Sequence, residues 1–280
     1  MATQKKTWLI TGVSTGFGRE LALAALARGD RVAGTVRQEA QRSEFDALAP
    51  GRSFGLRLDV TDGEAIGGVL KSAAAALGSI DVLVNNAGYG LFGAVEEVDD
   101  RECRRLMETN FFGLLNVTKA VLPLMRAAHR GHIVNFSSVA GISGLPGCGI
   151  YSASKFAVEG LSEAMAYELA PLGIKVTVVE PGGFRTNFAG GSKVFAAKVI
   201  DDYAATPAAN ARVMMSRYQG QEPGDPAKAA AAVISVVDAE DPPLRLLLGK
   251  DALHMARARF AVLSKDYDRW QQTSASTDVA

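Results

Sequence analysis

Short runs of apolar, β-branched residues alternate with longer segments of helical period along most of this 280-residue chain. Such apolar runs are typical of strands buried on both faces of a sheet, joined by helical right-handed crossovers. The pattern predicts an α/β fold with a doubly wound, seven-stranded parallel sheet flanked by helices. The expected strands are Thr7–Thr11, Arg31–Val36, Phe54–Leu58, Ile80–Val84, His132–Phe136, Lys175–Val179 and Leu244–Leu248, and the expected helices are Gly16–Arg28, Asp62–Leu77, Asp100–Ala128, Tyr151–Ala170, Pro226–Asp238 and Asp251–Ser264.

A glycine-rich turn joins the first expected strand to the first expected helix. Gly12 permits a tight turn, Gly16 lets the backbone approach a pyrophosphate, and Gly18 allows the helix to pack closely on the sheet. The helix N-terminus offers free N–H groups and a positive dipole end to phosphate. The spacing is G-x-x-x-G-x-G rather than G-x-G-x-x-G, and a plain glycine turn is the alternative reading. We predict a Rossmann-type dinucleotide site that includes Gly12, Ser14, Thr15, Gly16, Phe17 and Gly18.

Arg37 follows the second expected strand, where many NAD-binding folds carry an acid that binds the adenosine ribose. Val36 ends that strand without a carboxylate, and the Arg37 guanidinium could hold a 2′-phosphate through bidentate hydrogen bonds. The pattern therefore favours NADP(H) over NAD(H). Because Glu39 is close in sequence and Arg37 could simply cap a surface strand, NAD(H) stays open as the alternative.

Tyr151 and Lys155 lie four residues apart, which places both on one face of a helix. An ammonium beside the phenol would favour phenolate and lower the tyrosine pKa, ordinarily near ~10, toward neutrality. The pair Ser137 and Ser138 lies upstream and offers a hydroxyl that could polarise a substrate. The spacing by itself is common, and a tyrosine and a lysine on an exposed helix face are the alternative.

The formal net charge is zero, so we expect no nucleic-acid surface and no polybasic membrane patch. We expect no apolar stretch to approach the ~20 residues that span a bilayer, and we expect no leader peptide before the first strand. Cys103 and Cys148 lack metal-ligand spacing, and His129, His132 and His254 have no paired acid or cysteine. These features predict a cytoplasmic protein without a metal site or membrane contact.

Two segments interrupt the alternation. Residues 187–223 contain no expected strand and follow the sixth strand, near the sheet edge where such folds bind ligands, so they are predicted to form a lid-like insertion. Residues 271–280 are predicted to form a flexible tail, and Pro123 should kink or end its helix. We expect one domain over 1–280, with a cofactor-binding half at about 1–137 and a catalytic and substrate-binding half at about 138–270.

Several motifs occur in the order found in the short-chain dehydrogenase/reductase family, and the chain resembles that family over roughly residues 7–250. The glycine turn has the family form T-G-x-x-x-G-x-G. Ser138 precedes Tyr151 by thirteen residues, as the family serine does. The remaining matches are Asp59 and Val60 at the adenine segment, Asn86, Ala87 and Gly88 in an N-N-A-G turn, Asn110 in the fourth helix, Tyr151 and Lys155 in Y-x-x-x-K, and Pro181, Gly182 and Thr186 beside the nicotinamide.

The resemblance implies hydride transfer between a nicotinamide and a carbonyl or carbinol carbon. Tyr151 would be the general acid or base, and Lys155 would lower its pKa and bind the nicotinamide ribose. Ser138 would donate to the developing alkoxide, and Asn110 would hold a water that links Lys155 to solvent. One departure concerns the cofactor: family members that use NADP often carry a basic residue where this chain has Thr15, so Arg37 would discriminate alone.

The chain also resembles the branch that includes 17β-hydroxysteroid and retinol dehydrogenases, which implies an apolar carbonyl or alcohol substrate. The segment 187–223 and the side chains of Phe92, Ile142, Leu145, Phe184 and Phe188 are expected to line or cover the pocket. The family often pairs its fourth and fifth helices, which implies a homodimer or homotetramer. Two alternatives stay open: an NAD-dependent alcohol dehydrogenase working mainly in oxidation, and a non-catalytic dinucleotide sensor.

Overall fold

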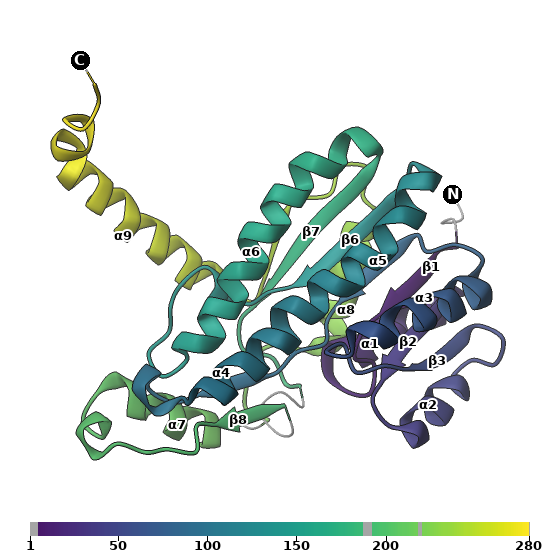
Figure 1. The fold of residues 1–280 in the computed structure, drawn as a ribbon, viewed down its shortest axis with the longest axis horizontal. Helices are drawn as coiled ribbons and strands as arrows, with labels where there is room; N and C mark the ends of the chain where they lie inside the picture. The colour runs from purple at the N-terminus through teal and green to yellow at the C-terminus, as the bar shows by residue number, and fades with distance from the viewer. Residues whose placement is uncertain (1–4, 187–191, 218–219, 280) are drawn as a thin grey trace.

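A computed structural model describes residues 5–186, 192–217 and 220–279 (Figure 1). The main sheet has seven parallel strands in the order β3-β2-β1-β4-β6-β7-β9, which confirms the predicted doubly wound fold. Each strand overlaps its expected range. The strands are β1 (Thr7–Ile10), β2 (Arg31–Val36), β3 (Ser53–Arg57), β4 (Val82–Asn85), β6 (Gly131–Phe136), β7 (Ile174–Pro181) and β9 (Arg245–Leu248).

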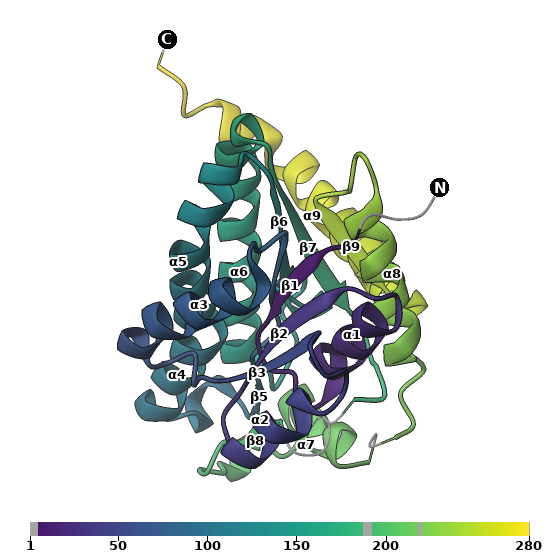
Figure 2. The ribbon, with the colours of Figure 1, turned by 90° about the vertical axis from the view of Figure 1, so that its right-hand side faces the viewer.

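Helices cover both faces of this sheet (Figure 2). Because successive strand residues point to opposite faces, Trp8 and Ile10 lie in one core and Leu9 lies in the other. Phe45, from a helix that was not predicted, completes the first core. That face carries α1 (Gly16–Ala27), α2 (Glu39–Asp46) and α8 (Pro226–Asp238), and the opposite face carries α3 (Gly63–Leu77), α5 (Gly113–Ala128) and α6 (Gly149–Leu169).

The strand order reverses between β1 and β4, which pair directly with each other. All strands of a parallel sheet end at the same edge, and ligands bind in the crevice beyond the carboxyl ends at such a reversal. The glycine turn follows β1, and Asn86 to Gly88 follow β4. The fold therefore brings two of the sequence motifs to one edge of the sheet.

The expected helix Asp100–Ala128 is helical throughout but not uniform. It consists of α4 (Asp100–Met107), a π-helical segment η2 (Glu108–Phe112) and α5, and Pro123 does not end it, because α5 continues to Ala128. By length and composition alone this helical stretch of 29 residues could cross a membrane, contrary to expectation. Its Val117, Val121 and Met125 side chains instead lie in the core against the sheet.

The segment after β7 contains a strand, which corrects the expectation that it has none. β8 (Lys193–Phe195) pairs in parallel with β5 (Gly90–Phe92), another strand that was not predicted. A helix, α7 (Pro207–Arg217), follows, and both elements lie beside α4 in Figure 1. Three-residue strands are too short to leave an alternating pattern in a sequence.

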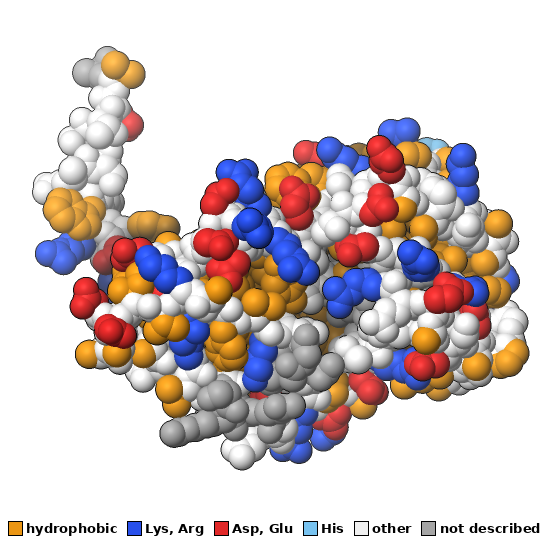
Figure 3. Space-filling model, turned by 60° about the horizontal axis from the view of Figure 1, so that its bottom comes forward, with side chains coloured by type: hydrophobic (Ala, Val, Ile, Leu, Met, Phe, Trp, Pro, Cys, Tyr) orange, Lys and Arg blue, Asp and Glu red, His pale blue; other side chains and the backbone are white. Residues whose placement is uncertain are grey.

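The last helix, α9 (Lys250–Ala275), continues beyond the expected end at Ser264, so the first residues of the expected tail are helical. Its C-terminal half projects from the body (Figure 1). Phe260, Tyr267 and Trp270 are exposed on it. On the face shown in Figure 3, acidic and basic side chains are interspersed.

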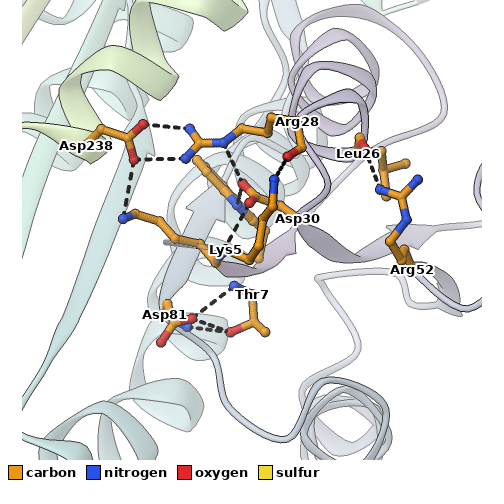
Figure 4. Close-up of polar contacts among 10 residues, drawn as sticks. Lys5, Thr7, Leu26, Arg28, Asp30, Arg52, Asp81 and Asp238 are labelled. Carbon is orange, nitrogen blue, oxygen red and sulfur yellow. Dashed lines mark hydrogen bonds and ion pairs between the residues drawn. The ribbon is translucent and has the colours of Figure 1, made fainter. Parts of the chain in front are cut away.

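The amino ends of the strands are fixed by a polar network (Figure 4). Asp30 accepts a hydrogen bond from Trp8 Nε1 at 2.9 Å and pairs with Arg28 Nε at 3.1 Å. Arg28 Nη1 lies 2.7 Å from Asp238 Oδ2, at the end of α8. Helices that follow parallel strands end at the strands' amino edge, so this network ties α1 and α8 together at the edge opposite the glycine turn.

Candidate active site

A cavity of about 570 Å³ opens where β1 and β4 end. Most of the predicted cofactor and catalytic residues line it, although they come from distant parts of the chain. Gly18, Asn110, Ser138, Pro181 and Gly182 are near this site but do not line it. The predicted residues in the lining are Gly12, Ser14, Thr15, Gly16, Phe17, Arg37, Asp59, Val60, Asn86, Ala87, Gly88, Tyr151, Lys155 and Thr186.

The glycine turn forms one wall of the cavity. Gly12 and Gly16 have φ values of +73° and +62°, which L side chains rarely adopt. A Cβ atom at Gly18 would collide with the Gly12 carbonyl and lie 2.5 Å from Asn86 Nδ2. Gly18 thus serves packing beneath the turn and does not face the cavity.

The first turn of α1 fits a phosphate. Thr15 is its N-cap, but its side chain makes no capping hydrogen bond, and the first turn contains no acidic residue. Within the described residues, the first N–H groups of this helix therefore keep their capacity to bind an anion. Gly16 faces Thr186, whose Cβ would be 3.6 Å from a Cβ at that glycine.

Asn86 fastens the end of β4 to the glycine turn. Its Nδ2 donates to the carbonyls of Thr11 at 2.9 Å and Gly12 at 3.0 Å, and Thr11 Oγ1 accepts from the backbone N–H groups of Asn86 and Ala87. Asn85 instead bonds Thr118 and Asn135 inside the core. Asn86 therefore sets the shape of the turn, while Ala87 and Gly88 line the cavity.

Arg37 lies at the far end of the cavity and is exposed. Among the described residues it has no acidic partner, because Glu39 pairs with Arg42 instead. At the same end, Asp59 accepts hydrogen bonds from the backbone N–H of Thr61 at 3.0 Å and from its hydroxyl at 2.8 Å. An unpaired guanidinium at this place suits a phosphate group.

Tyr151 and Lys155 are buried side by side at the other end of the cavity. Burial raises the pKa of Tyr151 to about 12, and a hydrogen bond with Ser138 opposes that rise. Burial lowers the pKa of Lys155 to about 8, and the Glu159 carboxylate opposes that fall. Lys155 Nζ donates to the Phe136 carbonyl at 2.8 Å. The largest effect on the tyrosine pKa is therefore burial, which raises it, and not the lowering that was expected from Lys155.

Asn110 is buried in the π-helical segment, where its side-chain amide bonds the protein itself. Oδ1 accepts from Tyr89 N at 3.0 Å, and Nδ2 donates to Tyr89 O at 3.0 Å and Ser154 Oγ at 3.2 Å. A Cβ at Gly88 would lie 3.0 Å from Asn110 Oδ1 and 3.8 Å from Lys155 Nζ. A side chain at Gly88 would therefore press on Asn110 Oδ1, while Lys155 Nζ would be in ordinary contact with it.

Of the motif residues at and after the end of β7, Thr186 lines the cavity, whereas Pro181 and Gly182 do not. Gly182 N donates to Leu248 O at 2.9 Å, which fixes the end of β7 against β9 outside the cavity. Thr186 reaches the cavity. Phe184, an expected pocket residue, packs instead on Phe17, with ring centres 5.1 Å apart, because it joins the core beneath α1.

Two other expected pocket residues, Phe92 and Leu145, lie behind the cavity wall. Phe92 stacks on Tyr151 with ring centres 6.5 Å apart, and Leu145 packs in the same cluster. Ile142 is half-buried outside the lining, and Phe188 lies outside the described residues. Ser192 and Val194 of the segment 187–223, which was expected to line or cover the pocket, are in the lining. The lining residues that sequence reasoning missed are Thr35, Val36, Leu58, Thr61, Tyr89, Leu91, Glu102, Arg105, Thr109, Phe136 and Ser137. Glu102, Arg105 and Thr109 have helical spacing on α4 and η2, the one signal that could have grouped them.

Comparisons with known proteins agree with this geometry. The family model described as short chain dehydrogenase matches residues 6–194. Oxidoreductase BOA17 of Botryotinia fuckeliana is 40% identical over 273 residues, which are 97% of this chain and 99% of that protein. Retinol dehydrogenase 8 of Homo sapiens is 35% identical over 264 residues, which are 88% of this chain and 82% of that protein.

Two solved structures show the same likeness. The structure of a short-chain dehydrogenase from Streptomyces avermitilis has a TM-score of 0.90 and 44% identity, and covers 99% of both chains. The closed form of serine dehydrogenase complexed with NADP+ has a TM-score of 0.73 and 27% identity, and covers 86% of this chain and 94% of that one.

Proposed function

This chain belongs to the short-chain dehydrogenase/reductase family, and from that premise we propose that it is an NADPH-preferring reductase of ketones or aldehydes. It is an oxidoreductase that acts on CH–OH or C=O groups. One observation carries the finer proposal: buried Tyr151 and Lys155 line the same cavity as the glycine turn and Arg37, and Ser138 is hydrogen-bonded to the Tyr151 phenol.

The residues present fit a nicotinamide dinucleotide. The uncapped first turn of α1 would hold the pyrophosphate, and the positive φ of Gly16 allows close approach. Arg37, without an acidic partner among the described residues, would hold a 2′-phosphate. Asp59 and Val60 would lie at the adenine, and Thr186 at the nicotinamide. When bound, the cofactor supplies or accepts the hydride.

The protein's own residues would move and stabilise the proton. Because the pKa of Tyr151 is about 12, its phenol is neutral at physiological pH and ready to protonate a developing alkoxide. Ser138, hydrogen-bonded to that phenol, would donate to the same oxygen. Lys155 would hold a positive charge beside them. In the alternative of NAD-dependent oxidation, the same Tyr151 oxygen would act as the general base.

Two features support a water relay at Asn110. Its Nδ2 uses both protons within the protein, whereas Oδ1 accepts one bond from the described residues and keeps a lone pair. A carbonyl in a π-helical segment can also bind water, and such segments are frequent at functional sites. A water held here would lie near Lys155 and could return its proton from solvent.

The substrate end of the cavity supports an apolar carbonyl compound. Leu91 and Val194 contribute apolar surface there, and Phe92 backs the Tyr151 ring. Similarity to retinol dehydrogenase 8 agrees with that class. Glu102 and Arg105 also line the cavity, so a polar group at one end of the substrate would be accommodated.

Quaternary structure and location are further parts of the proposal. The large apolar side chains Phe112, Leu124, Phe156 and Tyr167, exposed on η2, α5 and α6, support a homodimer or homotetramer built on these helices. Light scattering after gel filtration measures that state. The mixed surface charge of Figure 3 supports a cytoplasmic protein without nucleic-acid partners.

A panel of apolar ketones, aldehydes and their alcohols, followed by nicotinamide absorbance with NADPH and NADH in parallel, tests the activity. We expect turnover of some carbonyl compounds, with a higher kcat/KM for NADPH. Binding of NADPH without turnover of any compound would favour the non-catalytic sensor. A higher kcat/KM with NADH would overturn the cofactor preference.

A further inference from the structure

Behind the cavity, three carboxylates meet a single arginine. Arg245, on β9, forms ion pairs with Glu159 and Glu163 of α6 and with Glu180 of β7. Nη2 lies 2.8 Å from Glu163 Oε2, and Nη1 lies 3.1 Å from Glu180 Oε1 and also contacts Glu159 Oε2. Glu163 and Arg245 reach solvent, but the side chains of Glu159 and Glu180 are only 7% and 0% exposed.

The charges of this buried group do not balance if both inner acids are ionised. Two buried carboxylates would share one Nη1 group, and burial of an unpaired charge is costly. Glu159 Oε1 and Glu180 Oε2 are also buried, and neither accepts a well-formed hydrogen bond from a donor among the described residues. A single proton between the two carboxyl groups would remove one charge and satisfy both oxygens.

The acid pair is in contact with the catalytic group through Ser137. Glu159 lies one helical turn after Lys155, and the Ser137 hydroxyl donates to the Lys155 carbonyl at 3.5 Å and acts to lower the pKa of Glu159. Gly141 packs against both side chains, since a Cβ there would be 2.5 Å from Ser137 Oγ and 3.1 Å from Glu159 Cγ. Lys155 Nζ binds the carbonyl of Phe136, next to Ser137.

We propose that Glu159 and Glu180 hold one proton between them at neutral pH, and that Glu159 is a positioning residue which keeps Lys155 charged and in place. The shared proton depends only on this cluster. The role toward Lys155 rests on the function proposed above.

The direction of the pKa shifts agrees with one proton shared by two acids. Burial and the Glu159 charge raise the pKa of Glu180 to about 7, while burial raises the pKa of Glu159, opposed by Ser137 and Arg245. The charged groups that face the pair are Arg245 from β9 and, on α6, Lys155 and Glu163. Because the folded state binds this proton more tightly than the unfolded chain, it adds stability below the ordinary glutamate pKa that is lost as the pH rises to about 7.

Infrared spectroscopy of the cofactor-free protein tests the shared proton. At pH 6, where exposed carboxylates are ionised, we expect the C=O stretch of a protonated carboxylic acid in the wild type. Glu180→Gln and Glu159→Gln should both lose it. Glu163→Gln, which removes the solvent-exposed partner of the same arginine, should keep it. No such band in the wild type, or a band that survives in Glu180→Gln, would overturn the shared proton.

The pH profile of kcat tests the positioning role. Glu159→Gln should lower kcat by roughly tenfold or more and move the limb that reports Lys155 toward lower pH, since the carboxylate that favours the ammonium is gone. Glu163→Gln should retain the wild-type profile, and thermal unfolding shows that each variant is folded. A Glu159→Gln profile that matches Glu163→Gln would refute the role. If the wild type turns over no substrate, the proposed function fails, and the infrared result still decides the shared proton.

Discussion

The ammonium of Lys155 lies 5.8 Å from the centre of the Tyr151 ring, and its hydrogen bond goes to the Phe136 carbonyl instead of the phenol. Both side chains are buried, and burial favours the uncharged form of each. The tyrosine is therefore held as a neutral proton donor, with the cation close to its ring.

Replacement of the Tyr151 phenol separates proton transfer from cofactor binding. Tyr151→Phe should reduce kcat by ~10²–10⁴, because it removes the proton donor while it leaves the cavity walls in place. NADPH binding, followed by titration calorimetry, should be nearly unchanged. Tyr167→Phe, at a tyrosine 73% exposed on α6, is the matched control and should retain full turnover. Equal turnover in the two variants would exclude Tyr151 as the donor.

The buried Lys155 ammonium should lower the free energy of unfolding at neutral pH, although activity requires it. Burial lowers its pKa from the ordinary 10.5 to about 8, so the folded protein binds the proton of the ammonium less tightly than the unfolded chain does. Stability from this group is present above pH 10.5 and lost as the pH falls through 8. Lys155→Met should therefore raise the free energy of unfolding at pH 7 by about 2–3 kcal/mol and abolish turnover. A variant that unfolds more easily than the wild type would contradict this.

Arg37→Ala should weaken NADPH specifically. Loss of a charge-assisted pair with the 2′-phosphate should raise the Kd for NADPH about tenfold or more and leave that for NADH nearly constant. Arg104→Ala, at an exposed arginine that pairs with Asp100 on α4, is the control for loss of a positive charge. An equal rise for both cofactors would mean that Arg37 does not read the 2′-phosphate.

His132 should make the protein acid-sensitive. Its Nε2 lies 2.9 Å from Thr177 Oγ1, which donates its own proton to Pro243 O, so Nε2 carries the hydrogen. Burial, with smaller effects from Lys175 and Lys6, lowers its pKa to about 4. Stability from the neutral imidazole is present above pH 6.5 and lost as the pH falls to 4, by about 3 kcal/mol in total. Urea unfolding from pH 4 to 7 should show this loss in the wild type and a flatter dependence in His132→Gln.

Glu97 should hold the segment after β8 in place. This buried carboxylate accepts from Ile200 N at 3.0 Å, Ala94 N at 2.8 Å and Arg212 Nη2 at 3.1 Å. Glu97→Gln weakens all three bonds, so proteolysis within residues 192–217 should be roughly tenfold faster and the KM for carbonyl substrates should rise. Glu96→Gln, at the adjacent residue that bonds only Tyr203 among described side chains, is the control. Unchanged proteolysis in Glu97→Gln would show that this bond network does not hold the segment.

Local patterns were sufficient for the main sheet, because each strand and helix leaves its own period and its own turn residues in the sequence. The same holds for the glycine turn, where Gly12 and Gly16 adopt the positive φ values that their residue type permits. β5 and β8 escaped prediction because each is three residues long and exists through pairing with the other. Phe184 was assigned to the pocket from position alone, but the aromatic partner beneath α1 was not visible in sequence.

The sequence by itself determined the architecture and the order of the Tyr151, Lys155 and glycine-turn motifs, since these depend on residues close together in the chain. Only the tertiary structure decided the charges. It turned Glu39 toward Arg42 and so left Arg37 without an acid among the described residues, and it raised the tyrosine pKa by burial. It also gathered Glu159, Glu180 and Arg245 from three elements. Desolvation and ion pairing depend on which distant residues meet, and the fold alone sets that.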